Sequence, residues 1–250
     1  MLCMQKYKII VAYDGTDYFG WQQQKDVPTV ANTLQNHFYR VFGKKISLLG
    51  ASRTDAGVHA LGQIGQFSVD MNIDSKSMLY AWSNVLPSDI VIKKLEPVDN
   101  DFYIHGVVRN KTYHYNFFLE NPSPIEQRFG WYFRYPVSIK KLQDSLQVFV
   151  GTHDFRSFCT GDEREDTVRT ITSVSVAYDG QLNAHKIVIQ GPKFLRYMIR
   201  RMVGAALEVA SRPYLSSLDL YEALEKKDPQ QTLPKAPAKG LVLHNIELAL

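Results

Sequence analysis

The chain has 250 residues, of which 45% are hydrophobic and 22% charged, and its formal net charge is +4. This composition excludes a disordered or fibrous protein, and the length suits one large domain or two smaller ones. Two cysteines, Cys3 and Cys159, are too few for a disulfide framework, which favours a reducing, cytoplasmic environment. We expect neither a secretory leader nor a membrane helix, because no apolar run is long enough for one.

In the first half of the chain, strands alternate with helices. Apolar residues at every second position predict strands, and a spacing of three or four predicts helices. In chain order we predict a strand at 7–15, a helix at 28–43, a strand at 45–52 that runs into a loop, a strand at 59–70, a helix at 75–87 and a strand at 89–98.

The second half shows a related alternation. We predict a strand at 109–120, a helix at 139–151, a hairpin of 169–180 with 184–191, a helix at 194–212, a loop at 226–240 and a final strand at 241–250. The repeated order indicates a structural duplication joined near residues 99–110, without a direct sequence repeat. The hairpin favours a mixed or antiparallel sheet and therefore an α+β fold.

Basic residues are concentrated in two stretches. Residues 27–54 contain no acid, and residues 193–212 contain five Lys or Arg and one Glu. Such clusters replace the counterions of a phosphate backbone, so a nucleic acid is one candidate partner. Two solvated faces are the alternative, and charge alone does not decide between them.

The segment GASRTDAGVHA, residues 50–60, gathers charged and small residues between two apolar stretches. A carboxylate such as Asp55 acts as a base, a metal ligand or a nucleophile. No second carboxylate or His cluster lies near it in the sequence, so a nucleophile or a structural ion pair remains. Spacing alone favours the ion pair.

Several kinds of site are excluded by their missing motifs. The seven His residues do not occur at metal-ligand spacing, and no C-x-x-C is present. No Gly-rich phosphate-binding motif is present either. Asp14-Gly15-Thr16 is similar to the start of an aspartate-nucleophile phosphatase, but Ala12 stands where the nucleophile should be.

Motifs along nearly the whole chain resemble the TruA family of tRNA pseudouridine synthases. RTDAGVHA (53–60) resembles the catalytic motif of that family. Other matching segments follow the family order: YDGT (13–16) with Gly20 and Gln22, PTV (28–30), NVLP (84–87), Arg109 with KTYHY (111–115), GTHDF (151–155) with Ser157 and Phe158, FL (194–195) with MIR (198–200) and Gly204, and APA (236–238) with GL (240–241).

The resemblance implies a pseudouridine synthase fold, which is a mixed or antiparallel sheet built from two related α+β halves with a basic cleft between them. We assign these halves to residues 1–104 and 105–250. It also implies isomerisation of uridine at positions 38, 39 and 40 of the tRNA anticodon stem-loop, without cofactor or metal, by a homodimer.

Carried over to this sequence, the resemblance implies specific roles. Asp55 is the nucleophile, attacking C6 of the base or C1′ of the sugar, and Arg200 pairs with it and keeps it ionised. Tyr113 lies against the target base. Arg53 fills the gap left by the extruded base or contacts a phosphate. The remaining tRNA contacts are assigned to Arg109 and Arg196. Apart from the resemblance, we interpret His59 as a structural residue that orients the loop.

Two departures from the family pattern stand out. Ser52 replaces the usual Gly before Arg53, and the usual H-A-R after Phe102 is missing, which removes an arginine. Two alternative functions remain open. One is a catalytically silent RNA-binding module on the same fold, and the other is a phosphate-ester hydrolase that uses Asp14 or Asp55.

Overall fold

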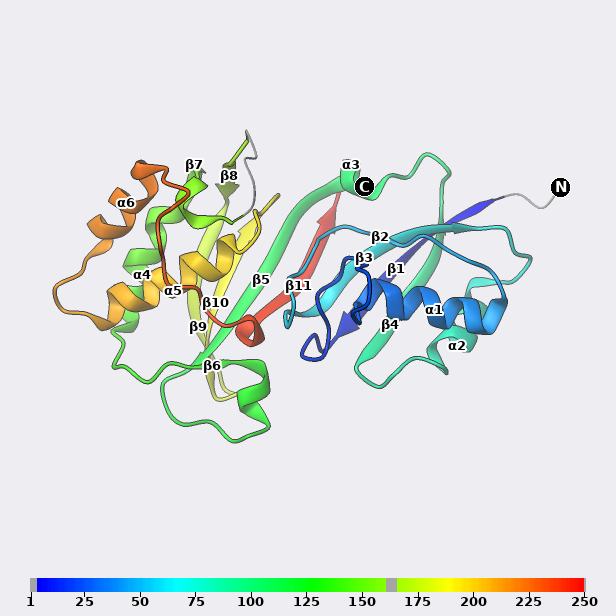
Figure 1. Ribbon diagram of the computed structural model, residues 1–250, viewed down its shortest axis with the longest axis horizontal. Coiled ribbons are helices and arrows are strands. Elements are labelled where there is room, and N and C mark those ends of the chain that lie inside the picture. The colour runs from blue at the N-terminus through cyan, green and yellow to red at the C-terminus, as the bar shows by residue number, and fades with distance from the viewer. Residues whose placement is uncertain (1–3, 161–165, 250) are drawn as a thin grey trace. The chain divides into compact units, whose positions relative to one another are not determined.

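The computed structural model describes residues 4–160 and 166–249, and the chain forms two compact units (Figure 1). Unit 1 combines Met1–Arg109 with Leu243–Leu250, and unit 2 is Asn110–Val242. The last strand therefore belongs mainly to unit 1, whereas the sequence placed it in the second half. The reason is its pairing, because β11 (Leu241–Leu248) lies beside β3 (His59–Val69). The two backbones approach closely at Gly62, where a Cβ would lie 2.6 Å from the His244 carbonyl oxygen.

Unit 1 is a sheet with the strand order β4-β1-β3-β11, and β1 is antiparallel to both β3 and β4. Helices α1 and α2 complete its core: the Phe38 ring packs edge-on against Phe67 and Trp82, with centroids 5.5 and 4.9 Å away. In chain order the elements are β1 (Gln5–Tyr13), α1 (Val30–Phe42), β2 (Leu49–Gly50), β3, α2 (Ser75–Ser83), β4 (Ile90–Val98), α3 (Ile104–Val107) and β11.

Unit 2 contains the neighbouring strands β5-β10-β9, antiparallel throughout, and a separate pair, β7 and β8. Helices α4, α5 and α6 pack together (Figure 1). The elements are β5 (Val108–Phe118), η1 (Glu126–Phe129), β6 (Trp131–Tyr132), α4 (Ile139–Leu146), η2 (Gln147–Phe149), β7 (Gly151–Asp154), η3 (Arg156–Phe158), β8 (Val168–Ile171), β9 (Ser173–Asp179), β10 (Ala184–Gly191), α5 (Met198–Ser211), α6 (Ser217–Lys226) and η4 (Ala238–Gly240).

The α+β class and the largely antiparallel sheet are confirmed, but several predicted boundaries are wrong. The predicted strand at 169–180 is two strands, because β8 pairs with β7 whereas β9 pairs with β10. The predicted helix at 194–212 begins only at Met198, because Tyr197 has a left-handed backbone with φ of 62°. The predicted strand at 45–52 retains only Leu49–Gly50.

The helix predicted at 139–151 is α-helical only to Leu146 and continues as a short 3₁₀ turn. Helix α6 was missed, although Ser216 and Asp219 form a capping box at its start, which is a readable signal. Among the described helices, none is both long and apolar enough to cross a bilayer. Cys159 is half-buried, with its Sγ 3.5 Å from the Arg156 carbonyl oxygen, and Cys3 lies outside the described residues.

Candidate active site

The RTDAGVHA segment forms most of the loop between β2 and β3 of unit 1 and ends on the first two residues of β3. Its side chains alternate in exposure: Arg53 is exposed, Asp55 is half-buried, and Thr54 and His59 are buried. The loop therefore presents its arginine and its aspartate at the surface of unit 1 while burying the residues beside them.

Hydrogen bonds from the segment 13–21, which follows β1, hold this loop. The Tyr13 hydroxyl lies 2.8 Å from Thr54 Oγ1, and the Trp21 N–H donates to the Thr54 carbonyl at 3.2 Å. The Gly57 N–H donates to the Tyr18 carbonyl at 3.1 Å. Within the loop, the Val58 N–H donates to the Asp55 carbonyl at 3.2 Å. The backbone on both sides of Asp55 is thus held in place by main-chain and side-chain bonds.

Two glycines allow the segment 13–21 to come this close. A Cβ on Gly15 would lie 2.0 Å from the Val58 carbonyl oxygen, and one on Gly20 would lie 2.4 Å from the Thr54 carbonyl oxygen. Gly20 also has φ of 89°, which side chains rarely tolerate. No other residue fits at either position without moving the loop that carries Asp55.

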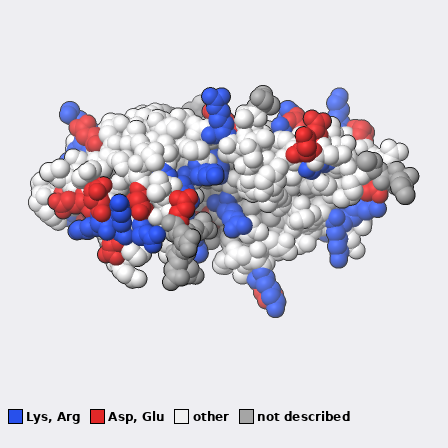
Figure 2. All heavy atoms as spheres, turned by 90° about the horizontal axis from the view of Figure 1, so that it is seen from above, with Lys and Arg blue, Asp and Glu red and all other residues white. Residues whose placement is uncertain are grey.

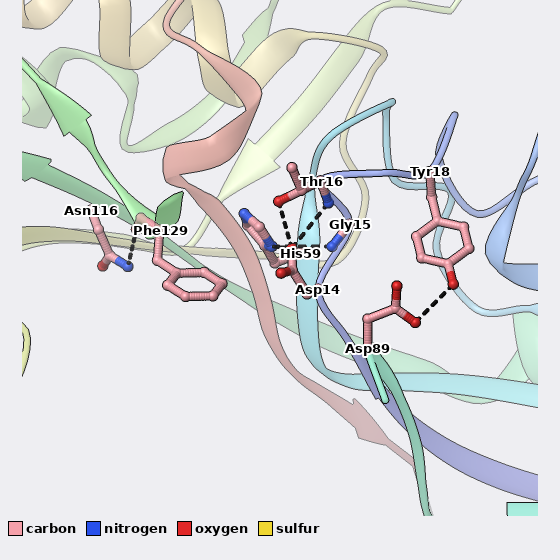
Figure 3. Close-up of polar contacts among 8 residues, drawn as sticks. All are labelled: Asp14, Gly15, Thr16, Tyr18, His59, Asp89, Asn116 and Phe129. Atoms are coloured by element: carbon pink, nitrogen blue, oxygen red, sulfur yellow. Dashed lines mark hydrogen bonds and ion pairs between the residues drawn. The ribbon is translucent and has the colours of Figure 1, made fainter. Parts of the chain in front are cut away.

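Asp14, which follows β1, and His59, the first residue of β3, are in contact (Figure 3). His59 Nδ1 lies 3.0 Å from Asp14 Oδ1 and 3.1 Å from the Gly15 amide nitrogen. Thr16 donates to Asp14 through its N–H and its hydroxyl, at 3.0 and 2.6 Å. A protonated Nδ1 donates to Asp14, and an unprotonated Nδ1 accepts from Gly15. His59 therefore contacts the 14–15 turn in either state, as expected of a residue that orients the loop.

Gln63 of β3 supports the entry to the loop, where Ser52 departs from the family pattern. The Gln63 side chain is fully buried and donates to the Ser52 carbonyl at 2.6 Å. It also accepts from the Ser52 N–H at 3.3 Å. Both bonds use only the backbone of Ser52, so the serine side chain is tolerated without loss of either.

Residues 102–107, where the sequence departs from the family pattern, contain the single helical turn α3 (Ile104–Val107) and are bonded to β3. Gln66 accepts from the Ile104 N–H at 2.7 Å and donates to the Phe102 carbonyl at 3.4 Å. The Tyr103 and His105 rings pack edge-on with centroids 5.6 Å apart. The segment is therefore held by its bonds to Gln66 and by the contact between these two rings.

Unit 2 carries Tyr113 and Arg200. Tyr113 lies on β5 and is 5% exposed, with its ring edge-on to Phe194 at a centroid distance of 5.2 Å. Arg200 lies on α5 and is 9% exposed. Its Nε donates to the Ala236 carbonyl at 2.8 Å, and its own carbonyl accepts from the Ala236 N–H at 3.0 Å. These bonds hold the Nε end of the guanidinium and the main chain of Arg200 in place.

The basic stretch 193–212 is only partly available to a ligand. Arg201 donates to the Ser157 and Cys159 carbonyls at 3.3 and 2.9 Å, and Arg212 pairs with Glu208 at 2.9 Å. On the face of the molecule that Figure 2 displays, acidic side chains lie beside basic ones in several places. Arg196 remains exposed.

A further cation, Lys111 of β5, has an unusual environment in unit 2. Burial, together with the nearby charge of Lys193, lowers its pKa to about 8. Tyr115, four residues after Lys111 on β5, pairs with Ile187 of β10 and is fully buried. Burial raises the pKa of its hydroxyl well above the usual value. That hydroxyl donates to the Pro237 carbonyl at 2.9 Å, so it acts as a structural donor.

The predicted site residues fall into two groups. The first group, in unit 1, is Arg53, Asp55 and Arg109; the second, in unit 2, is Tyr113, Arg196 and Arg200. Within unit 1, the loop carries Arg53 and Asp55 together, whereas Arg109 is exposed on β5. Within unit 2, Arg196 and Arg200 both lie over the ring of Tyr197, with Cζ 4.8 and 5.3 Å from its centroid.

Sequence reasoning missed Tyr197, Lys235 and the supporting residues Tyr13 and Gln63. Tyr13 and Tyr197 lie inside motifs that were recognised, which was the available signal. No local signal marked Lys235 or Gln63.

Two other features of the described residues do not add to the site. A hollow of about 850 Å³ in unit 1 is lined by residues 97–103 together with parts of β1 and β11, and it includes neither Asp55 nor Arg53. No group of three or more His, Cys, Asp or Glu within residues 4–160 and 166–249 is arranged to hold a metal ion.

Comparison with known proteins gives a consistent result. The family described as tRNA pseudouridine synthase matches residues 9–105 and 146–247. The chain is 38% identical to tRNA pseudouridine synthase A of Pseudothermotoga lettingae over 98% of this chain and 100% of that protein. It is 36% identical to the proteins of the same name from Limosilactobacillus reuteri (98% and 97% of the two chains) and Acetivibrio thermocellus (96% and 98%).

Proposed function

We propose, because the chain belongs to the tRNA pseudouridine synthase family, that it isomerises uridine to pseudouridine at positions 38, 39 and 40 of the tRNA anticodon stem-loop, with Asp55 as the nucleophile. The observation that carries the proposal is the fixed RTDAGVHA loop. Its backbone is bonded at Thr54, Gly57 and Val58, so Asp55 is held by a rigid support. A reacting group held in one position lowers the entropic part of the barrier.

The reaction rearranges bonds without oxidation or reduction. The Asp55 carboxylate attacks C6 of the uracil or C1′ of the ribose. The N1–C1′ bond breaks, the base turns, and a C5–C1′ bond forms. The hydrogen on C5 then leaves as a proton, N1 gains a proton, and the carboxylate is released unchanged.

Attack requires Asp55 to be ionised. A nearby cation favours the carboxylate over the carboxylic acid. In this proposal Arg200 supplies that cation, and the bonds from its Nε and carbonyl to Ala236 support its position within unit 2. Tyr113 packs against the uracil in the same proposal. The edge-on contact with Phe194 limits the positions that its ring can take.

Stem uridines are paired, so the target base must first leave the helix, at a cost of a few kcal/mol. Arg53, exposed two residues before Asp55, is suited to occupy the gap or to hold a phosphate of the displaced strand. Arg109 and Arg196, both exposed, supply further contacts to the tRNA.

We also propose a cytoplasmic homodimer, on the family resemblance. Sedimentation at the concentration used for activity measurements tests the assembly. Twice the chain mass of 28.6 kDa supports a dimer, and an active species of that single mass overturns it.

Unmodified tRNA transcripts carrying tritium at uridine C5 test the reaction and its positions, because pseudouridine formation expels the C5 hydrogen. Three transcripts, each with its anticodon-stem uridine at only 38, 39 or 40, should each release tritium. A fourth without uridine at these positions is the control. Release only from the control, or from none while the folded protein binds tRNA, would contradict the proposal, and the second result would favour a silent RNA-binding module.

A further inference from the structure

Three cationic side chains of unit 2 converge on one aromatic ring, that of Tyr197. Its centroid lies 4.2 Å from Lys235 Nζ, 4.8 Å from Arg196 Cζ and 5.3 Å from Arg200 Cζ. Arg196 also donates from Nη2 to the Tyr197 hydroxyl at 3.1 Å. A ring has two faces, so at least two of these cations share one. The attraction of each cation to the ring offsets part of their mutual repulsion.

The backbone around Tyr197 brings Lys235 into this cluster. Gly204 of α5 lies so close to the loop that a Cβ would be 2.3 Å from the Pro234 carbonyl oxygen. On the other side of Lys235, Ala236 is bonded twice to Arg200. The residues on both sides of Lys235 are therefore held against α5, and its position over the ring follows from fixed backbone.

Tyr197 itself adopts an uncommon conformation. Its φ of 62° and ψ of 0° are left-handed, and a bulky side chain disfavours that region. This conformation lets the ring lie beside Arg196, its neighbour in the chain, while α5 begins at the next residue. Such an outlier is retained where the surroundings require it, and here it organises the cations.

Arg196 and Lys235 are accessible and lack a counter-charge from the described part of the chain. Both side chains are exposed, and among residues 4–160 and 166–249 no carboxylate pairs with either. Cations gathered with exposed heads suit an anion with several oxygen atoms, such as a phosphate. Cations already lie over the Tyr197 ring, so this ring is less suited to stacking on a nucleobase than the cations are to binding a phosphate.

We infer that Arg196 and Lys235, held on the ring of Tyr197, form a subsite for one backbone phosphate of the tRNA. This inference rests on the proposed function, because it takes tRNA as the ligand. It assigns the organising role to Tyr197 and a phosphate contact to Lys235, a residue outside the motifs that carry the family resemblance.

Equilibrium binding of an unmodified tRNA transcript, measured between about 50 and 200 mM salt, tests the subsite, because each lost phosphate contact reduces the salt slope of the affinity by about 0.7 to 0.9. Lys235→Ala should lose about one such contact and bind about tenfold more weakly at low salt. Tyr197→Asn should weaken binding similarly although every charge remains, and Asn tolerates the left-handed backbone. Tyr197→Phe keeps the ring and should bind close to wild type.

Lys140→Ala is the matched control, since this side chain is 89% exposed on α4 and its removal changes the net charge equally. It should bind as wild type. The inference is overturned if Lys235→Ala and Tyr197→Asn keep the wild-type affinity and slope, or if Lys140→Ala weakens binding as much as Lys235→Ala. Thermal unfolding of each variant checks that it is folded.

The two proposals fail separately. Binding is measured without turnover, so a wild-type protein that releases no tritium would refute the reaction and leave the phosphate subsite to the binding data. Conversely, wild-type turnover together with unchanged binding by the variants would refute only the subsite. In an active enzyme, the Lys235→Ala loss should appear in KM rather than in kcat.

Discussion

The two units place their candidate site residues by different physical means. In unit 1 the loop around Asp55 is held by close backbone approach, through Gly15 and Gly20, and by hydrogen bonds. In unit 2 cations are gathered around Tyr197, and Lys111 lies near Lys193. Steric packing is insensitive to salt and pH, whereas interactions between charged groups respond to both. Under the proposed function, unit 1 fixes the reacting group and unit 2 supplies an electrostatic environment for the anionic substrate.

The largest expected effect is the loss of stability caused by adding a methyl group beside the loop of unit 1. Gly15→Ala places a Cβ 2.0 Å from the Val58 carbonyl oxygen, and because neither backbone can yield cheaply we expect a loss of about 3 kcal/mol or more in the free energy of unfolding. Urea unfolding measures it, and the loss should not change with salt. Gly180→Ala, with no atom within 4 Å of the new Cβ, is the matched control.

If Gly15→Ala unfolds at the same urea concentration as wild type and as Gly180→Ala, close packing does not hold the loop. A loss of activity without loss of stability would show instead that the loop moves to admit the methyl group, and the view of unit 1 as a rigid support would be contradicted.

The next effect tests unit 2 through its charge. The folded pKa of Lys111 is about 8, below the model-peptide value of 10.5, because burial disfavours the ammonium form. Between these two values the unfolded chain retains a proton that the native chain has lost, so wild-type stability should rise as the pH increases from 8 to 10.5. Lys111→Met should lack this rise and be more stable by about 2 kcal/mol at pH 7.

Urea unfolding at pH 7 and pH 10 compares the two proteins. Lys193→Met is an informative control, because removing its charge raises the folded pKa of Lys111 and should shift the onset of the rise to higher pH. Parallel pH profiles for wild type and Lys111→Met would show that the lysine is not under electrostatic stress.

The smallest effect concerns one hydrogen bond of unit 1. Tyr13→Phe removes the bond between the Tyr13 hydroxyl and Thr54 Oγ1, which should cost about 1 kcal/mol in the free energy of unfolding. Tyr7→Phe is the control, since the Tyr7 hydroxyl bonds to none of the described residues, and it should cost close to nothing. Equal losses in the two variants would mean that the Thr54 bond does not support the loop.

The sequence predicted the features that are local. The strand at β1, the helix from Thr29 to Gly43 and the RTDAGVHA loop could be read from nearby residues, because periodicity, caps and motifs are encoded within a few positions. The split between β8 and β9 could not be read, because it depends on which distant strand each segment pairs with.

Contacts between distant segments were the other features that could not be predicted. Asp14 and His59 both belong to recognised motifs, yet nothing in either motif says that they meet. Lys235 and Tyr197 are 38 positions apart, and they meet because Gly204 admits the Pro234 carbonyl and because Tyr197 is left-handed. Both causes are properties of the folded backbone.

Tritium release from C5-labelled tRNA by wild type and by Asp55→Asn, compared in single-turnover reactions with the protein in excess, tests the central claim most directly. Asparagine preserves size and removes the nucleophilic carboxylate. We predict release by wild type and none above background by Asp55→Asn. Both proteins should bind tRNA with affinities within about threefold, because the Asp55 carboxylate makes no contact with a phosphate. Release by Asp55→Asn at the wild-type rate would contradict the assignment of Asp55 as the nucleophile.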